Sequence, residues 1–357
     1  MKVALHVGQL RQPVPGGIGT YVRGLIASLP ATGVTLSTFA SGPGEPTWPD
    51  YRDLGRPRPP LRYSLWHALR RPRVRTDADL VHAPTLAIPP TRPTPLVVTV
   101  HDVAFLRFPD AFPRHGVRFH RRGLKLARRR ASAVIVPSAY TASELVTEGF
   151  EPDLLFVAPH GAPVVRPRAE AEVDAVLDAL EVPTPFVLAV GTLEPRKGLR
   201  TLFASFAELR LRDATLVVAG PAGWGETRVP PDVKALGAVA PDVLDALYRR
   251  ASACAVPSVY EGFGLPALEA MAYGTPVVAS DTASLPEVVG PAGRLVSPGD
   301  VDGWAEALAS LVGDSEERER LGAAGRARAE GFTWARSAVA HVDAYRAAMS
   351  RDAGRRT

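Results

Sequence analysis

Two glutamates, Glu261 and Glu269, stand eight residues apart on either side of a glycine-containing turn. Gly262 and Gly264 let the backbone turn sharply and approach a ligand closely. Pro266 suits the first turn of a helix, because proline lacks the N–H group that would stay unpaired there. We therefore expect a helix to open at this proline. Its unpaired N–H groups and its positive end would attract an anion such as a diphosphate.

An apolar run at 253–256 comes directly before this turn and is typical of a buried strand that ends there. The alternative interpretation, a solvated acidic loop before a surface helix, leaves that run unexplained. Cys254 is the only cysteine of the chain and lies within the run, so we interpret it as a core residue. A single cysteine excludes an intramolecular disulfide and a cysteine-based zinc site.

Arg196 and Lys197 form a second candidate group, because they follow the apolar run 186–191, which predicts another buried strand. A guanidinium binds a diphosphate through two parallel hydrogen bonds, and an ammonium acts as a mobile point charge. An exposed basic turn alone would be unremarkable, but together with the glycine-containing turn it predicts a diphosphate site. The short apolar segment 236–239, which ends at Val239, is expected to run beside a flat base.

In the first half, Gly16 and Gly17 follow an apolar run at 2–8 and precede a predicted helix. A strand, a glycine-rich turn and a helix in succession can cradle an anion, although a simple tight turn is an equal alternative. The pattern is not G-x-G-x-x-G and no Walker lysine follows, so a dinucleotide fold or a P-loop is disfavoured.

His101 and Asp102 follow the predicted strand 95–100. Polar residues at the carboxyl end of a parallel strand are where α/β proteins place their ligands. We therefore expect His101 and Asp102 to contact a ligand, and a hydrogen-bonded structural histidine is the alternative for His101. His82 ends a neighbouring strand, and there we expect a structural role.

The segment 114–130 is strongly basic, and the predicted helix would carry a dense cationic face. Its basic residues are Arg114, Arg118, Arg121, Arg122, Lys125, Arg128, Arg129 and Arg130. Such a face can lie on an anionic membrane surface, and a merely solvated helix face is the alternative. Nucleic acid is not expected as a partner, because no recognition module is visible and aromatic residues are not interleaved.

The composition is that of a globular protein, with 46% hydrophobic and 22% charged residues among 357. No signal peptide and no run of about 18 apolar residues is visible, so we expect a cytoplasmic protein. A peripheral position at the inner face of the membrane is compatible with this expectation. The net charge of +5 is uneven: residues 1–165 contain 21 basic and 11 acidic residues, and the remainder is net acidic. A basic first half indicates that one domain meets something anionic.

Alternating strand and helix patterns occur twice, which predicts an α/β protein with two similar domains. We expect an N-terminal domain at 1–165, a linker at 166–184, a C-terminal domain at 185–332 and a final helix within 333–357. Residues 41–75 are rich in proline and arginine, so they are expected to be irregular.

Taken together, these patterns resemble the retaining glycosyltransferases of the GT-B class, family 4, and their α-mannosyltransferase-like branch. The matching residues are Gly16 to Gly19, His101-Asp102, Val190 to Gly198, and Glu261 to Pro266 with Glu269, which match the E-x7-E pattern of the family. The loop Gly223-Trp224-Gly225 is also similar to the mannosyltransferase-like branch. The resemblance covers nearly the whole chain and is most specific over 186–300.

The resemblance implies two Rossmann-like domains with a sugar-nucleotide cleft between them, and a last helix that crosses back to the first domain. By resemblance, Arg196 and Lys197 neutralise the donor diphosphate and Gly17 touches it. Glu269 accepts hydrogen bonds from the ribose, and Glu261 faces the transferred sugar. The remaining implied donor contacts are Gly16, Val239, Gly262, Phe263, Gly264 and Leu265. His101 lines the sugar pocket near the reacting bond and is the fourth implied catalytic residue beside Glu261, Arg196 and Lys197, and His101 and Asp102 are expected on the acceptor side.

The implied activity is metal-independent transfer of a hexose, with retention, to a glycan or a lipid-linked saccharide. No cofactor is expected beyond the donor, for which GDP-mannose is favoured and a UDP-hexose is possible. Because Glu269 is committed to ribose in this picture, a front-face mechanism is implied rather than a pair of carboxylates across the anomeric carbon. A sugar-nucleotide epimerase or phosphorylase of the same fold, or a non-catalytic glycan-associated subunit, remain the alternatives.

Overall fold

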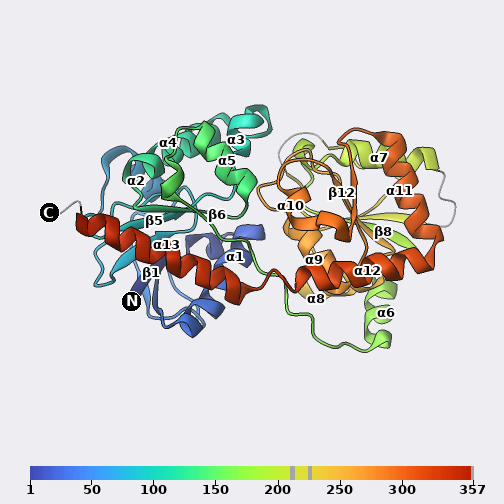
Figure 1. Ribbon diagram of the computed structural model, residues 1–357, viewed down its shortest axis with the longest axis horizontal. Helices are drawn as coiled ribbons and strands as arrows, with labels where there is room; N and C mark the ends of the chain where they lie inside the picture. Colours follow the sequence, from blue (N-terminus) through green and yellow to red (C-terminus); the bar gives the residue numbers. More distant parts are fainter. Residues whose placement is uncertain (210–213, 224–226, 355–357) are drawn as a thin grey trace. The chain divides into compact units, whose positions relative to one another are not determined.

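The computed structural model describes residues 1–209, 214–223 and 227–354, and these form two compact units (Figure 1). The first unit comprises Met1–Pro109, Pro113–Gly161 and the residues from Thr333 onward, and the second comprises Ala162–Phe332 with Asp110–Phe112. Each unit is built around a parallel sheet with helices on both faces. The predicted α/β class is therefore confirmed.

The first unit contains a seven-stranded parallel sheet in the order β3-β2-β1-β4-β5-β6-β7. Its strands are β1 (Lys2–His6), β2 (Thr35–Ala40), β3 (Tyr51–Asp53), β4 (Leu80–Ala83), β5 (Leu96–Thr99), β6 (Ala133–Val136) and β7 (Leu155–Val157). The central strands read as continuous apolar runs because helices cover both faces of a parallel sheet. The strand order reverses between β1 and β4, and ligands bind at such switch points in open α/β sheets.

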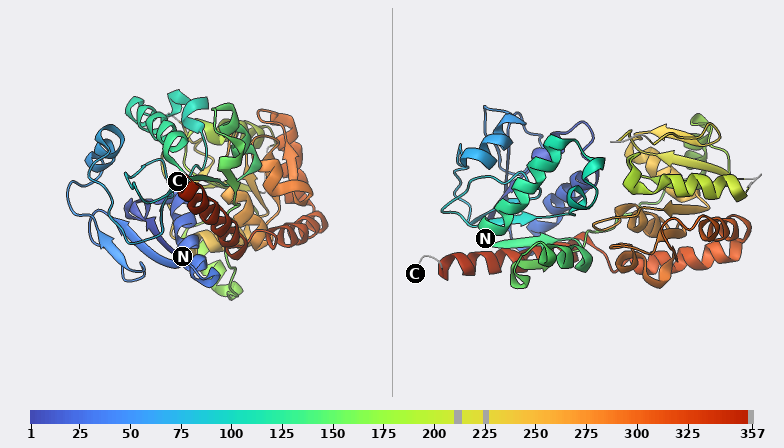
Figure 2. Two further views of the ribbon diagram at one scale, coloured as in Figure 1. Left: turned by 60° about the vertical axis from the view of Figure 1, so that its left-hand side comes forward. Right: turned by 90° about the horizontal axis from the view of Figure 1, so that it is seen from above.

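The helices of this unit are α1 (Gly16–Ser28), α2 (Leu61–Leu69), α3 (Ala104–Arg107), α4 (Arg114–Arg130), α5 (Ala139–Thr147) and α13 (Trp334–Gly354). Its 3₁₀ turns are η1 (Gly8–Arg11), η2 (Leu29–Thr32), η3 (Pro109–Ala111) and η4 (Pro152–Leu154). The last helix, α13, lies along this sheet in Figures 1 and 2 and packs on α1, β5, β6 and β7. It buries Ala338, Val342 and Tyr345 in the same hydrophobic core as Val3, Leu5 and Leu25.

The second unit contains a six-stranded parallel sheet in the order β10-β9-β8-β11-β12-β13. Its strands are β8 (Phe186–Val190), β9 (Thr215–Ala219), β10 (Lys234–Gly237), β11 (Ala253–Val256), β12 (Val277–Ser280) and β13 (Arg294–Val296). The reversal of strand order falls between β8 and β11. These two neighbours precede the two loops that the sequence singled out.

Helices cover both faces of this second sheet. They are α6 (Glu170–Ala179), α7 (Leu199–Leu209), α8 (Pro241–Arg250), α9 (Leu265–Tyr273), α10 (Leu285–Val289), α11 (Val301–Gly313) and α12 (Ser315–Ala329), with 3₁₀ turns η5 (Pro195–Lys197) and η6 (Gly290–Ala292). Trp304 and Leu308 of α11 pack with Leu202 of α7 on one face. Leu247 of α8 and Leu268 of α9 belong to the core on the other.

Two expectations about irregular segments differ from the structure. Residues 41–75 are not irregular throughout, because they contain β3 and α2, and Trp66 of α2 is fully buried. The expected linker 166–184 contains α6, whose Val173 and Leu177 belong to the core of the second unit. Buried Trp66 anchors α2, and two apolar residues at one-turn spacing, Val173 and Leu177, anchor α6.

Candidate active site

The loops that follow β8 and β11 are joined directly to one another. The backbone N–H of Val259 donates to the carbonyl oxygen of Arg196 at 2.9 Å. Gly198 has a φ of +66°, and a Cβ atom there would lie 1.8 Å from the carbonyl oxygen of Pro257. Only glycine fits this close approach, which holds the η5 turn against the β11 loop.

This contact brings Arg196 and Lys197 onto the carboxylate of Glu261. The Lys197 Nζ donates to Glu261 Oε1 at 2.7 Å, and an Arg196 Nη1 lies 3.4 Å from Glu261 Oε2. The same Nη1 donates to the Tyr260 carbonyl at 2.8 Å. Ser258 Oγ gives Glu261 Oε1 a third donor at 2.7 Å. The structure thus brings together three of the four predicted catalytic residues.

The electrostatic balance of this cluster explains the protonation state of Glu261. Burial alone would raise the pKa of its carboxyl, but Lys197, Arg196 and the Ser258 hydroxyl outweigh it and lower the pKa to about 2. A second buried carboxylate, Glu194, pairs with the other side of the Arg196 guanidinium. Two cations therefore face two carboxylates, and Arg196 and Lys197 are both engaged in ion pairs.

Helix α9 begins beside this cluster. Its N-terminal flank is Gly264, with a φ of +103°, where a Cβ atom would lie 2.7 Å from Leu285 Cδ2. Phe263 is buried and packs edge-to-face on Phe332 at 6.0 Å between ring centroids. The positive end of α9 is therefore fixed next to Glu261, with Leu265 and Pro266 in its first turn.

Glu269 lies one turn into α9 and remains partly exposed. The Tyr248 hydroxyl of α8 donates to its Oε2 at 3.0 Å. Burial raises the pKa of the Glu269 carboxyl to about 7, although the Tyr248 hydroxyl opposes the shift. Val239 lies in the β10–α8 connection and packs against the core that contains α8 and α9.

In the first unit, Gly16 and Gly17 are exposed and form the first turn of α1, after β1 and η1. Gly16 has a φ of +61°, and a Cβ atom there would meet no neighbour. The side chain of Gln9 in η1 fixes the entry to the helix by donating to the Pro15 carbonyl at 2.9 Å. The predicted strand, glycine turn and helix are therefore present.

His101 and Asp102 follow β5, as expected. The Nε2 of His101 is 2.9 Å from the Pro84 carbonyl oxygen, and its ring meets Tyr21 edge-on at 4.8 Å. Burial lowers the pKa of His101, so the ring is neutral near pH 7. The Asp102 carboxylate accepts from the backbone N–H of Ala104 at 2.9 Å.

Behind His101 lies a hydrogen-bonded chain of neutral side chains, which we call the buried polar chain. Its members are Tyr345, His82, Thr99, Tyr21 and His341, with successive separations of 2.8, 2.8, 2.7 and 2.7 Å. Nδ1 of His341 is also 2.7 Å from the Ser337 carbonyl oxygen. Two of the five members come from α13. The expected structural role of His82 agrees with its full burial here.

Four contributors were missed by sequence reasoning: Glu194, Ser258, Tyr248 and Ser284. Ser284 Oγ donates to the main-chain carbonyl of Glu261 at 2.9 Å. Ser258 lies three residues before Glu261, and Glu194 lies two before Arg196, so proximity to a candidate residue was the available signal. Tyr248 and Ser284 lie far along the chain from their partners, and no local pattern indicates them.

Within the described residues, no group of three histidine, cysteine, aspartate or glutamate side chains is placed to hold a metal ion. No described helix is both long enough and apolar enough to span a bilayer. Trp224 and Gly225 of the predicted loop 223–225 lie outside the described residues.

Two Rossmann-like units, with charged and histidine-bearing loops at the carboxyl ends of their strands, define the GT-B class of glycosyltransferases. Two family models match the chain. The model described as "Glycosyltransferase Family 4" matches residues 15–166, and the model described as "Glycosyl transferases group 1" matches residues 184–314. An O-antigen chain mannosyltransferase B of Escherichia coli is 32% identical over 80% of this chain and 79% of its own length. The protein belongs to this glycosyltransferase family and is a hexosyltransferase.

Other relatives and folds agree with this membership. An MMP alpha-(1->4)-mannosyltransferase of Mycolicibacterium hassiacum is 35% identical over 72% of this chain and 66% of its own length. A sucrose-phosphate synthase of Thermosynechococcus elongatus shares the fold, with a TM-score of 0.70 at 22% identity over 97% of this chain and 98% of its own. An Anabaena protein solved with UDP-glucose gives 0.73 at 21% identity, over 96% and 99% respectively.

Proposed function

We propose that the protein transfers a hexose, with mannose favoured, from a nucleoside-diphosphate sugar to a hydroxyl of a glycan or a lipid-linked saccharide, and that the anomeric configuration is retained. The observation that carries the proposal is the carboxylate of Glu261, held by Lys197, Arg196 and Ser258 next to the positive end of α9. The names of two relatives as mannosyltransferases support mannose as the sugar, and GDP-mannose is the donor that we propose. A UDP-hexose is the second candidate donor.

In this proposal, Arg196 and Lys197 bind the donor diphosphate and stabilise the charge that develops on it as the glycosidic bond breaks. Both cations already pair with carboxylates, so the diphosphate joins an existing network instead of filling an empty cationic site. The N–H groups at the start of α9 add a fixed positive potential. Gly16 and Gly17 are proposed to add N–H donors from the first unit.

Glu261 is suited to an electrostatic role and not to proton transfer. A carboxyl whose pKa is about 2 stays ionised at neutral pH and is a weak base. It is therefore proposed to hold a sugar hydroxyl and to stabilise positive charge at the anomeric carbon. Deprotonation of the acceptor falls to the leaving phosphate in a front-face mechanism, for which Arg196 and Lys197 supply the charge in place of a metal.

The proposed nucleotide and sugar contacts follow from position. Glu269, with Tyr248 beside it, is proposed to accept hydrogen bonds from the ribose hydroxyls, and Val239 to contact the base. Gly262, Phe263, Gly264 and Leu265 are proposed to bind the phosphate and sugar through the main chain. Neutral His101, with Asp102, is proposed to line the sugar and acceptor side.

A donor panel tests this function most directly. Thermal unfolding of the full chain is followed with GDP-mannose, UDP-glucose and UDP-N-acetylglucosamine, because a ligand that binds the folded state raises its stability by mass action. The anomeric configuration of the product is then read by NMR. Release of nucleoside diphosphate in the absence of any acceptor, or an inverted product, would contradict the proposal.

We also propose that the cationic face of α4 contacts an anionic membrane surface. Its eight basic side chains are exposed, while Gly123, Leu124 and Ala127 are buried against the first unit. Such a face adds about 1 kcal/mol per charge near an anionic surface. Cosedimentation with vesicles at low salt is expected and should weaken as salt screens the charges. No cosedimentation at low salt would contradict this contact.

A further inference from the structure

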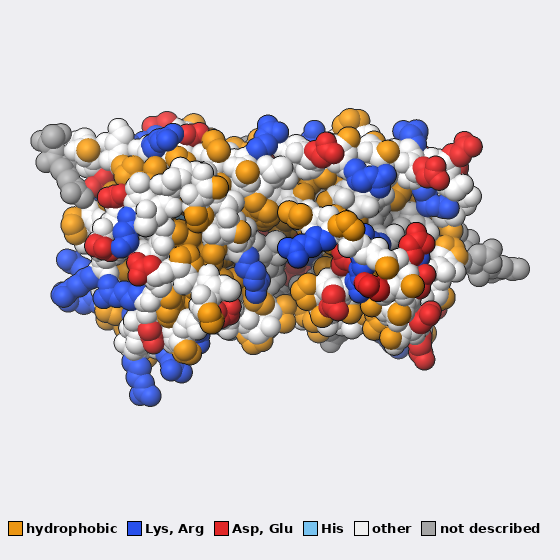
Figure 3. Space-filling view, turned by 90° about the horizontal axis from the view of Figure 1, so that it is seen from below, with side chains coloured by type: hydrophobic (Ala, Val, Ile, Leu, Met, Phe, Trp, Pro, Cys, Tyr) orange, Lys and Arg blue, Asp and Glu red, His pale blue; other side chains and the backbone are white. Residues whose placement is uncertain are grey.

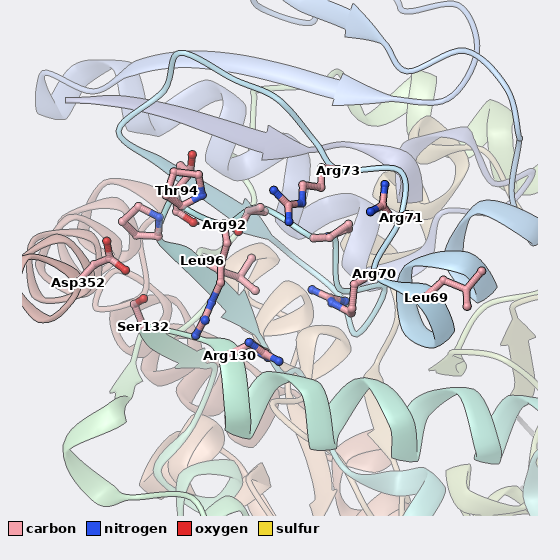
Figure 4. A pocket seen from close by; sticks show the side chains of 14 residues that line it. Leu69, Arg70, Arg71, Arg73, Arg92, Thr94, Leu96, Arg130, Ser132 and Asp352 are labelled. Atoms are coloured by element: carbon pink, nitrogen blue, oxygen red, sulfur yellow. Dashed lines mark hydrogen bonds between the residues drawn. The ribbon is translucent and has the colours of Figure 1, made fainter. Parts of the chain in front are cut away.

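A second cationic site lies in the first unit, in a cavity of about 480 Å³ (Figure 4). Leu96, the first residue of β5, and Ser132, which immediately precedes β6, lie in its wall. The cavity is therefore at the edge of the sheet where the strands begin, whereas His101 and Asp102 follow the carboxyl end of β5. Because β5 is four residues long, about 13 Å of strand separates the two edges.

Five arginines line this cavity, and we call it the arginine pocket: Arg70, Arg71, Arg73, Arg92 and Arg130. They come from three places in the chain, namely the segment after α2, the loop between β4 and β5, and the C-terminal end of α4. Figure 4 shows Arg70, Arg73, Arg92 and Arg130 around one hollow. The one carboxylate among the lining residues is Asp352 of α13, so the lining is strongly net positive.

Arg70 forms the fixed floor of the arginine pocket. Its backbone, just after the end of α2, has a φ of +52°, a conformation that is uncommon outside glycine. Its guanidinium donates to the carbonyls of Trp66, Ile88 and Pro89 at 2.8, 2.9 and 2.9 Å. Burial lowers the pKa of Arg70 to about 10, and the positive charge of neighbouring Arg130 adds to this shift.

The other arginines of the pocket keep their donors available. No ion pair or hydrogen bond of the Arg73, Arg92 or Arg130 side chain occurs within the described part of the chain. The helix dipole stabilises a positive charge at Arg130, because this residue ends α4. Arg73 and Arg92 lie in loops, so no helix dipole stabilises their charges. Thr94 and Ser132 add hydroxyl groups to the same wall.

The arginine pocket differs in its charge pattern from the face drawn in Figure 3. On the face drawn in Figure 3, basic and acidic side chains are interspersed, as is usual for exposed charges. Guanidinium groups that gather in a hollow repel one another, and a bound dianion removes that repulsion. The planar fork of arginine matches phosphate oxygens with two parallel hydrogen bonds, and a cavity of this size holds a small ligand.

We propose that the arginine pocket binds a phosphoryl group, carried by a soluble phosphate ester or by a lipid headgroup. This site is separate from the donor diphosphate site of the second unit, and the inference does not rest on the proposed reaction. Arg73, Arg92 and Arg130 are the ligands, and Arg70 holds the floor of the pocket through its carbonyl contacts.

The test compares two full-length variants that lose the same charge. The pocket variant carries Arg73→Ala, Arg92→Ala and Arg130→Ala, and the control carries Arg56→Ala, Arg58→Ala and Arg336→Ala, three exposed arginines of the first unit that lie outside both the pocket and α4. Pyrophosphate binding is measured by calorimetry at low salt. The groups around Arg196 and Lys197 are unchanged in all three proteins, so wild type and control are expected to bind two pyrophosphates and the pocket variant one.

A second arm separates the two sources of the phosphoryl group. Cosedimentation is measured with phosphatidylcholine vesicles that contain phosphatidic acid or lack it. A pyrophosphate site lost only in the pocket variant assigns a soluble ester. Phosphatidic-acid-dependent binding that falls at least tenfold only in the pocket variant assigns a lipid headgroup. Equal losses in the two variants, or no pocket-dependent binding in either arm, would overturn the proposal, and a midpoint of unfolding near that of wild type verifies folding.

Discussion

The two units share one strand order but differ in the chemistry at the carboxyl ends of their strands. In the second unit, Glu194, Arg196, Lys197 and Glu261 form a compact group of paired charges. In the first unit, the equivalent edge holds His101 and the buried polar chain, all neutral near pH 7. The same topology thus supports a cluster of paired charges in one unit and, in the other, a neutral hydrogen-bonded group with the Asp102 carboxylate beside it.

This difference corresponds to the two substrates of the proposed reaction. A diphosphate carries charge that buried, paired cations and a helix end can stabilise. An acceptor hydroxyl is neutral, so uncharged donors and acceptors hold it without the large desolvation cost of a buried ion. The comparison predicts that substitutions in the second unit act mainly on turnover, and substitutions in the first unit mainly on stability.

Removal of a cation from the charged group should have the largest effect. Lys197→Ala leaves Glu261 with Arg196 and Ser258, and the developing charge on the diphosphate loses one of its two cations. We expect kcat to fall by about 100-fold or more, measured as steady-state turnover with donor and acceptor. Lys234→Ala is the control, because Lys234 is also a lysine of the second unit and forms only an exposed pair with Glu181 at 3.6 Å. Turnover in Lys197→Ala equal to that of the control would refute the assigned role.

Removal of one hydrogen bond from the buried polar chain should lower the stability of the first unit. Tyr345→Phe leaves one nitrogen of fully buried His82 without its partner, at a cost of about 1–3 kcal/mol. We expect urea unfolding of the full chain to show this loss in the transition of the first unit. Ser143→Ala, at an exposed position of α5, is the control. If Tyr345→Phe lowered kcat and left stability unchanged, the contrast between the units would be wrong.

The two glutamates should give opposite pH dependences of stability. The pKa of Glu269 is about 7 in the folded state against an ordinary 4.5, so its contribution is fully present below pH 4.5 and is lost as pH rises through 7. At about 1.4 kcal/mol per pKa unit, the change is at most about 3 kcal/mol. Glu261, with a pKa of about 2, contributes stability above pH 4.5 that is lost as pH falls through 2.

Urea denaturation between pH 4 and 8 checks the first of these effects. Glu269→Gln should flatten the decline of stability across pH 4.5–7, and the slope that remains belongs to the other titrating groups. The same slope in wild type and variant would show that the Glu269 pKa is not raised. Donor affinity should also improve as pH rises past 7, because a carboxylate accepts from ribose hydroxyls better than a carboxylic acid does.

The smallest effect is expected from two serines around Glu261. Ser258→Ala removes a donor from the carboxylate, so kcat should fall a few-fold, in line with about 1 kcal/mol for one hydrogen bond. Ser284→Ala removes a donor from the main-chain carbonyl of the same residue and should reduce stability with little change in kcat. Equal kinetic losses in the two variants would show that the carboxylate contact has no special part in turnover.

Much of the fold was accessible from the sequence because a buried parallel strand reads as an apolar run. The predicted strand at 186–191 matches β8, and the run at 253–256 matches β11. Residues 41–75 and 166–184 were misjudged because their proline and charge content concealed short apolar patterns. In α6, Val173 and Leu177 suffice to dock the helix.

The sequence was sufficient to predict which residues form the candidate site, but not which of them contact one another. Arg196, Lys197 and Glu261 stood out individually at predicted strand ends. Their pairing depends on β8 and β11 being neighbours, and strand order is a global property that local patterns do not specify. Sequence reasoning therefore found both cations but not their ion pairs with Glu261 and Glu194.

The buried polar chain has one consistent direction of hydrogen bonding. The Ser337 carbonyl can only accept, so Nδ1 of His341 carries the proton and its Nε2, in the neutral ring, accepts from Tyr21. The Tyr21 oxygen must then accept from the Thr99 hydroxyl, which in turn accepts from Nε2 of a histidine on β4.

That histidine is His82, and its tautomer is now determined as well: Nε2 carries the proton and Nδ1 accepts from Tyr345. Every hydrogen therefore points the same way, from one residue of α13 through the sheet and back to the main chain of α13. Helix α13 therefore provides both ends of the buried polar chain, namely the Tyr345 hydroxyl and the Ser337 carbonyl. These two groups set the tautomers of His82 and His341, although both lie more than 230 positions from Thr99 in the sequence.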